Sequence, residues 1–230
     1  MSMWSFMSGT LLLCTAVLSG QQDSVLVDKD FRFVDGAYHS WTALLHNQPS
    51  YGLASLDGRL VLQAEQYLLK IENLHPKGRP ELSFDLEKLP IICLDGLPYV
   101  RAYYDTVRQF TVYAGLRVRG QLSYFAYETP TQDTVLIKAY NPINGQPFRR
   151  HKIIKPGVQL QEFLLKLTTG QVWPYTLEHL LEAISDDPAL VKSLTQLSPQ
   201  QARERMQKVI LIYDDRHPLY LPAVRGLDKE

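Results

Sequence analysis

The densest set of side chains that could hold a metal ion lies near the C-terminal end of the sequence. Asp214, Asp215 and His217 are separated by no more than one intervening residue. Carboxylate oxygens suit hard cations, and a zinc site needs three or four ligands, so this set would need further ligands from elsewhere in the chain. The simpler interpretation is a helix end with solvated charges, where Pro218 follows His217 directly. We therefore expect no metal and no cofactor, and keep this cluster as the alternative.

A second set of residues has the types found in hydrolytic sites. Asp35 and His39 could polarise Ser40, although a catalytic triad is defined by positions in space and not by sequence spacing. A turn at Asp35-Gly36 explains the same residues more simply. The chain has no phosphate-binding Gly loop, Gly-x-Ser-x-Gly elbow, His-Glu-x-x-His pair or Cys-x-x-Cys pair. We expect a non-enzymatic binding or envelope-associated module, with a hydrolase or metal-dependent enzyme of the cell envelope as the alternative.

Basic residues interleaved with aromatic ones form the best candidate for a binding surface. The candidate binding residues are Arg117, Arg119, Tyr124, Arg149 and Arg150. Such a surface could bind an anionic glycan, a phosphate or nucleic acid. Alternation of polar side chains on a sheet that faces water would give the same pattern. Because 24 Lys and Arg balance 24 Asp and Glu, we expect no nucleic acid partner and instead an unknown envelope protein or glycan.

The middle of the chain must supply the strands that position these residues. Runs rich in Tyr, Phe and Val, separated by short polar or Gly breaks, predict an antiparallel sheet. Strands are expected over 23–34, 51–56, 59–63, 67–71, 82–84, 91–94, 96–104, 109–114, 120–128, 134–140 and 148–154. Tight turns are expected at Asp57-Gly58, Asp95-Gly96 and Asn144-Gly145, because Asp, Asn and Gly tolerate the backbone angles that such turns require.

Helical patterns dominate the last third of the sequence. Apolar residues at 160, 163, 164 and 167 predict an amphipathic helix over 158–167. Capping residues predict three more helices, beginning after Thr176, Asp187 and Ser198, the last with Gln201 completing a capping box and ending near residue 213. A short helix is expected within 39–47, and residues 219–222 are expected to pack back as an extended segment.

These elements predict an α+β protein, with an antiparallel β-rich sheet or partly open barrel followed by a C-terminal group of short helices. The expected organisation is a signal peptide (1–20), a β-rich domain (21–156), a helical region packed on it (157–222) and a frayed tail (223–230). A hydrophobic content of 45% and a charged content of 21% are ordinary for a folded globular protein.

The first twenty residues differ from the rest of the chain. The segment Trp4–Leu18 carries no charge, and the small residues Ser19 and Gly20 follow it, a pattern typical of a secretory signal peptide. We expect export to the periplasm, the extracellular space or the cell surface, with no transmembrane span after cleavage. A buried N-terminal helix or an uncleaved anchor is the alternative. Cleavage would leave Cys93 alone in an apolar run, which predicts a buried thiol and no internal disulfide.

Several short motifs are similar to those of a known group of proteins. They are Asp35–Tyr38, Asn47–Ser50, Asp95–Tyr99 and the tail Tyr213–Pro222. These stretches resemble uncharacterised exported proteins of Bacteroidota-type bacteria, and the resemblance covers most of the chain that follows the leader. It implies export and a β-rich fold, and it implies no particular activity.

Overall fold

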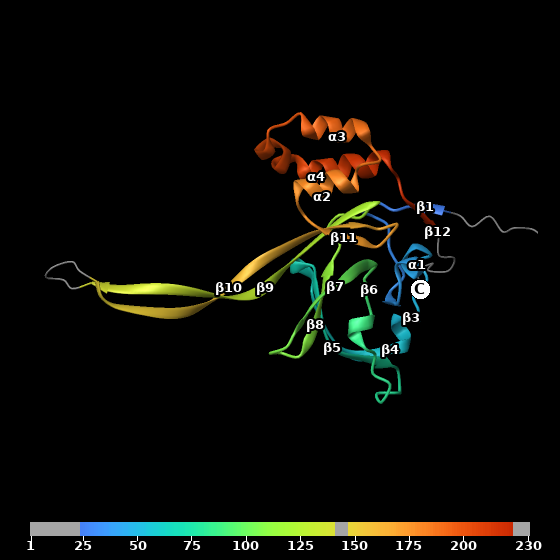
Figure 1. Cartoon of the computed structure of the whole chain (residues 1–230). Coiled ribbons are helices and arrows are strands. Elements are labelled where there is room, and N and C mark those ends of the chain that lie inside the picture. Colours follow the sequence, from blue (N-terminus) through green and yellow to red (C-terminus); the bar gives the residue numbers. More distant parts are fainter. Residues whose placement is uncertain (1–23, 141–146, 223–230) are drawn as a thin grey trace, which may run out of the picture.

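The protein folds as one seven-stranded antiparallel sheet, a long β-hairpin and a group of three helices (Figure 1). The computed structural model describes residues 24–140 and 147–222, and for residues 133, 137–140 and 147–151 it describes the backbone only. The predicted α+β class, with a partly open barrel and short helices near the C-terminal end, is confirmed.

The seven-stranded sheet supplies the body of the molecule. In spatial order its strands are β3 (Tyr51–Gly52), β2 (Gly36–Tyr38), β6 (Ile91–Leu94), β7 (Leu97–Asp105), β8 (Phe110–Gly115), β5 (Leu68–Pro76) and β4 (Leu56–Gln63). A 3-10 turn of residues 53–55 joins edge strand β3 directly to the opposite edge strand β4, so the sheet curls toward closure. One side buries Leu69, Ile71 and Tyr113, and the Tyr113 hydroxyl donates to the carbonyl of Leu89.

Two of the expected turns can be compared with the structure. Asp95 and Gly96 form the tight turn between β6 and β7, with φ angles of 54° and 72° that favour Gly, so that prediction is confirmed. The turn expected at Asp57-Gly58 is wrong, because β4 runs straight through both residues. Gly58 is needed there for a close approach, since a Cβ would lie 2.3 Å from the Asn73 carbonyl oxygen.

The predictions for the remaining short segments have mixed outcomes. Strand β4 turns into β5 through residues 64–67 instead, where Tyr67 adopts a left-handed φ of 56°. Residues 82–84 are irregular, so the strand expected there is wrong. The turn expected at Asn144-Gly145 lies outside the described residues. A short helix does form within 39–47, as α1 (Trp41–Leu45).

The long hairpin joins β9 (Leu122–Tyr140) to β10 (Pro147–Lys166), and β11 (Gln171–Pro174) pairs with the inner end of β10. The helix expected over 158–167 is therefore wrong. This stretch is apolar on consecutive residues because the strand is buried on both faces at its inner end. Leu164 packs under the helices, whereas Leu165 and Leu167 pack toward the seven-stranded sheet. A short apolar run of this kind also fits a helical period.

The three C-terminal helices begin where their caps predict. They are α2 (Leu177–Ala183), α3 (Pro188–Thr195) and α4 (Pro199–Arg216). Thr176, Asp187 and Ser198 each accept a backbone N–H bond at the start of a helix, and Gln201 completes the capping box. The helices lie together on one side of the hairpin base and share a core with β9 (Figure 1).

The two ends of the described chain lie side by side. The expected extended segment at 219–222 contains β12 (Tyr220–Pro222), which pairs in antiparallel fashion with β1 (Ser24–Leu26). Leu221 from β12 is buried with Val27 and Phe31 in the core between the sheet and the hairpin. Among the described residues, no helix combines the length and hydrophobicity needed to cross a membrane.

Candidate functional site

The outer part of the β9–β10 hairpin projects far from the body of the molecule (Figure 1). We call residues 128–160 the arm. Within the described residues, the two strands of the arm pair only with each other, whereas the inner end of β10 also pairs with β11. Both long edges of the arm therefore carry backbone N–H and C=O groups that can accept a further strand.

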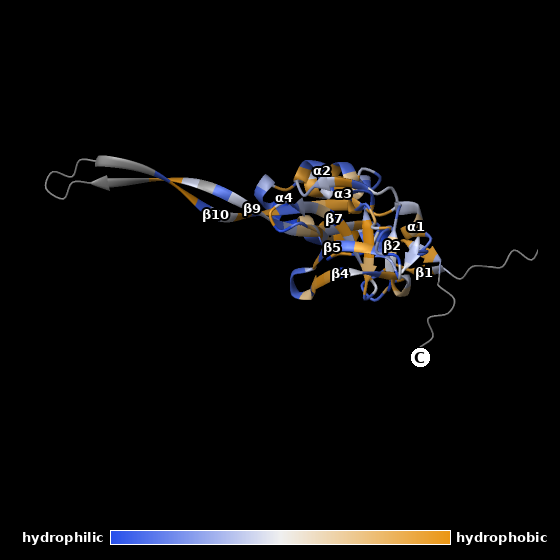
Figure 2. Cartoon of the chain, turned by 90° about the horizontal axis from the view of Figure 1, so that it is seen from below, coloured by the Kyte–Doolittle hydropathy of each residue, from blue (hydrophilic) through white to orange (hydrophobic). Residues whose placement is uncertain are grey.

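One face of the arm carries an apolar stripe. The register places Leu160 opposite Glu128, Val158 opposite Pro130, Ile154 opposite Thr134 and Leu136 opposite Lys152, so all these side chains share a face. We call Leu136, Ile154, Val158 and Leu160 the apolar stripe. Their exposed fractions are 44%, 63%, 68% and 54%. Figure 2 shows hydrophobic segments on the arm outside the body.

Among the side chains that the structure describes, the other face of the arm has less exposed apolar surface. Val135 and Ile153 are each 38% exposed there, and beyond them toward the body this face carries Thr131, Thr129 and Gln159. The two faces therefore differ in character. A set of large exposed apolar side chains on one face of a projecting element indicates a surface that another molecule covers.

A groove with a volume of about 380 Å³ lies where the arm leaves the body. Pro130 and Val158 line it from the arm, and Tyr103 and Phe110 line it from the sheet. Gln63, at the end of β4, also lines the groove, and its side-chain oxygen is buried without a hydrogen-bond partner among the described residues. The groove also carries the charged residues Lys70, Asp105, Arg108 and Glu128, so apolar and charged side chains meet where the stripe reaches the body.

The five residues predicted to form a basic binding surface do not gather at one place. Arg149 and Arg150 lie on the outer part of the arm, opposite Ala139 and Lys138 in the strand register. Tyr124 lies at the hairpin base, where it is nearly buried and donates a hydrogen bond to Glu162. Burial, with that carboxylate as a second cause, raises the pKa of the Tyr124 hydroxyl.

The remaining two basic candidates line a separate cavity of about 470 Å³ beside α4. The Arg119 guanidinium donates to the carbonyl oxygens of Phe31 and Lys29, so it holds the N-terminal segment in place. Burial lowers the pKa of Arg119. The Arg117 guanidinium lies 5.5 Å from the centre of the Tyr67 ring. Both arginines therefore make contacts within the protein, Arg119 through two hydrogen bonds and Arg117 through an aromatic ring.

Two of the three residues of the alternative metal cluster, Asp214 and Asp215, line the same cavity from the end of α4. The Asp214 carboxylate accepts a 2.8 Å hydrogen bond from the Leu122 N–H and so joins α4 to the start of β9. Burial raises the pKa of Asp214 to about 7, against the opposing effect of that hydrogen bond. Its second oxygen is buried without a partner among the described residues and packs on Gly120.

The third residue of the alternative metal cluster, His217, takes part in a different set of contacts. Its Nε2 atom lies 3.6 Å from Asp187, and its ring stacks on Tyr213. Asp187 also caps α3 and pairs with Arg216 at 3.0 Å. In the parts of the chain that the structure describes, no group of three or more His, Cys, Asp or Glu side chains is arranged to hold a metal ion.

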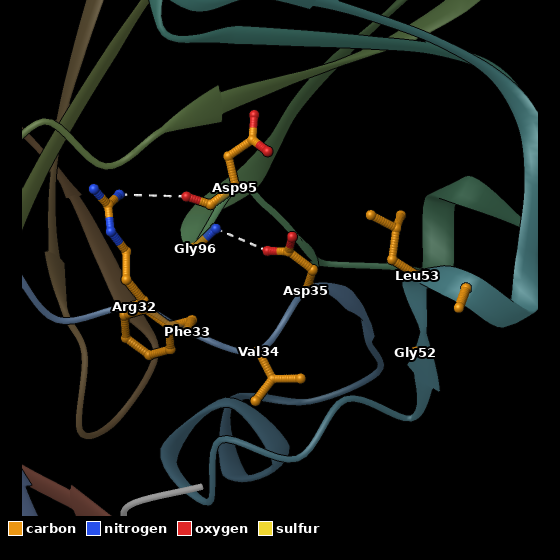
Figure 3. A pocket seen from close by; sticks show the side chains of 9 residues that line it. Arg32, Phe33, Val34, Asp35, Gly52, Leu53, Asp95 and Gly96 are labelled. Atoms are coloured by element: carbon orange, nitrogen blue, oxygen red, sulfur yellow. Dashed lines mark hydrogen bonds between the residues drawn. The ribbon is translucent and has the colours of Figure 1, made fainter. Parts of the chain in front are cut away.

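The residues of the hydrolytic alternative also have separate contacts. Asp35 accepts a 2.8 Å hydrogen bond from the Gly96 N–H (Figure 3), and Ser40 caps α1 through the Ala43 N–H. The His39 ring packs against Tyr51 with centroids 5.6 Å apart. Within the described residues, no hydrogen bond joins Asp35, His39 and Ser40 to one another.

An open cavity of about 720 Å³ lies beside Asp35 and has mainly apolar walls. Figure 3 shows Arg32 at its rim, where the guanidinium donates to the carbonyl of Asp95.

Cys93 lies nearby on β6 but is fully buried, and burial raises the pKa of its thiol well above the usual value. A thiol in this state is a structural group and a poor nucleophile.

Sequence reasoning missed the apolar stripe. The sequence does show apolar residues at these positions, since Leu136 and Ile154 lie in predicted strands and Val158 and Leu160 in a predicted helix. They can be assigned to one face only when the pairing register across the hairpin is known.

Comparison with known proteins supplies no independent assignment: no protein-family model, no curated protein and no solved structure matches this chain.

Proposed function

We propose that this chain is an exported, non-enzymatic protein-binding module of the periplasm or cell surface, and that the arm is its binding element. The observation that carries the proposal is the apolar stripe on a projecting ribbon whose two edges are free within the described residues. A stripe of this kind is costly to expose to water and favours association.

The free edges support a protein partner in particular. Unpaired strand edges bind extended or sheet-forming chains through backbone hydrogen bonds, while side-chain contacts on the face add specificity. A glycan or phosphate partner is less well supported, because the basic candidates Arg117 and Arg119 lie outside the arm and contact other parts of the protein. The separation of Asp35, His39 and Ser40 favours binding over hydrolysis.

Export rests on the sequence. The uncharged segment Trp4–Leu18, followed by Ser19 and Gly20, is typical of a cleaved leader. N-terminal sequencing of the protein recovered from fractionated cells tests this part. We expect an N-terminus close to Gln21 in the envelope or secreted fraction, and an intact Met1 in the cytoplasmic fraction would refute export.

Site-specific photo-crosslinking tests the arm in the cells that make the protein. A photo-reactive phenylalanine is placed either at Val158 in the apolar stripe or at Gln159, its neighbour on the opposite face. We expect a discrete protein adduct from position 158 and little or none from position 159. Equal labelling at both positions, or no adduct at either, would refute the arm as the binding element.

A further inference from the structure

The apolar side chains on this face of the arm are arranged symmetrically about its midpoint. Along this face, the midpoint is the pair formed by Gln132 and Pro156. On one side of the midpoint lie Val158 and then Leu160, and at the same spacing on the other side lie Ile154 and then Leu136.

Resting on the proposed function, we propose that the molecule covering the arm is a second copy of this chain. The two arms lie antiparallel, with one apolar stripe against the other, about a two-fold axis at the midpoint. Val158 of each copy then meets Ile154 of the other, and Leu160 approaches Leu136. Two sheet faces packed in this way lie about 10 Å apart, a spacing that interdigitated aliphatic side chains fill. An interface made from one self-complementary patch closes after two copies.

The charges on the same face favour this orientation. Over 128–136 and 152–160, the described part of this face carries two charged residues, Glu128 and Lys152. They lie at equal distances on opposite sides of the midpoint. Antiparallel arms place Glu128 of each copy close to Lys152 of the other, whereas parallel arms would place like charges together.

The net charges of the arm and the body also favour the antiparallel orientation. Residues 128–160 contain five Lys or Arg and two Asp or Glu, a net charge of +3. The body, residues 24–127 and 161–222, contains 17 Lys or Arg and 19 Asp or Glu, a net charge of −2. All five basic residues, which lie within 138–155, are on the outer side of the midpoint pair. In the antiparallel arrangement each basic end points toward the acidic body of the other copy.

Sedimentation velocity and light scattering on the full chain, purified from cells with its N-terminus defined by mass spectrometry, test the inference. We expect a dimer at micromolar concentration. Val158→Asp places a charge in the apolar contact and should give a monomer, whereas the matched control Gln159→Asp adds the same charge on the other face and should leave the dimer intact. Circular dichroism verifies that both variants are folded, since both side chains are exposed.

A charge exchange tests the orientation. Glu128→Lys or Lys152→Glu alone turns two attractive pairs into two repulsive ones, and each should weaken the dimer about tenfold at low salt. The double exchange should restore wild-type affinity. A chain that stays monomeric at 100 µM, a dimer unaffected by Val158→Asp, or a double exchange without recovery would overturn the inference. A monomeric chain whose position 158 crosslinks to a different protein overturns only the second-copy inference and leaves the proposed function standing.

Discussion

Replacing Asp214 by Asn should remove most of a pH dependence that this carboxyl group gives to the stability of the fold. Burial raises the pKa of Asp214 from 3.8 to about 7 in the folded protein. Between these two values the folded chain holds a proton that the unfolded chain has released. The free energy of unfolding therefore falls as the pH rises from about 4 to about 7, and is constant with respect to this group above that range.

The size of the effect follows from the shift in pKa. One pKa unit corresponds to about 1.4 kcal/mol, so a shift from 3.8 to about 7 gives about 2.5 kcal/mol of lost stability between pH 5 and pH 7.5. The charged groups that line the cavity together with Asp214 are Asp28, Lys29, Arg117, Arg119 and Asp215. Asp215 adds to the rise, and the Leu122 N–H bond opposes it.

The assay is urea unfolding at pH 5.0 and pH 7.5, applied to the wild type, Asp214→Asn and Asp215→Asn. In Asp214→Asn the side-chain oxygen can still accept from the Leu122 N–H, but the group no longer titrates. We expect this variant to gain about 2.5 kcal/mol in stability relative to the wild type between pH 5 and pH 7.5, because it lacks the group whose ionisation destabilises the wild-type fold over this range. The exposed control Asp215→Asn should keep most of the wild-type pH dependence. An Asp214→Asn variant that loses as much stability as the wild type between the two pH values would refute the argument.

Two further predictions concern packing at the hairpin base. Gly120→Ala would place its Cβ 2.2 Å from an oxygen of Asp214, so we expect a loss of about 2 kcal/mol in urea unfolding, whereas Gly52→Ala, with open space around its Cβ, should be nearly neutral. Leu164→Ala removes a fully buried side chain and should cost about 3 kcal/mol, whereas Leu160→Ala, four residues away on the same strand and 54% exposed, should cost less than about 1 kcal/mol in a monomeric background such as Val158→Asp. Equal losses within either pair would contradict the packing described here.

The parts of the fold that were predictable from sequence are those with local signals. Thr176, Asp187 and Ser198 cap helices through hydrogen bonds to residues only three positions away, so a short window of sequence contains the whole interaction. The turn at Asp95-Gly96 is local in the same sense, because the two residues themselves adopt the left-handed backbone angles that it needs.

The errors arise where a distant segment decides the structure. Gly58 resembles a turn residue, but its role is to let β4 approach the Asn73 carbonyl on β5. The stretch 158–167 has a helical spacing of apolar residues, but its inner half is buried on two faces by parts of the chain that are far away in sequence. Sequence periodicity does not distinguish these cases.

The candidate site was harder to predict than the fold for the same reason. Arg117, Arg119 and Asp214 line one cavity although Asp214 follows the arginines by almost a hundred residues. Pro130 and Val158 are neighbours only because the hairpin register brings them together. Each residue type was visible in the sequence, but the set to which it belongs was not.

The apolar stripe is a continuation of the pattern that builds the hairpin base. On the helix-facing side, Leu122, Tyr124, Ala126 and Leu164 are buried beneath α2 and α4. Beyond the helices, the same face continues through Leu160 and Val158 to Ile154, and each of these side chains is more than half exposed. A ribbon that served only as a spacer would be stable in water with polar residues at these positions. The apolar face extends along the arm beyond the helices that cover its inner end. The proposed second copy would cover this extension. The Val158→Asp and Gln159→Asp pair is therefore the decisive comparison for this protein.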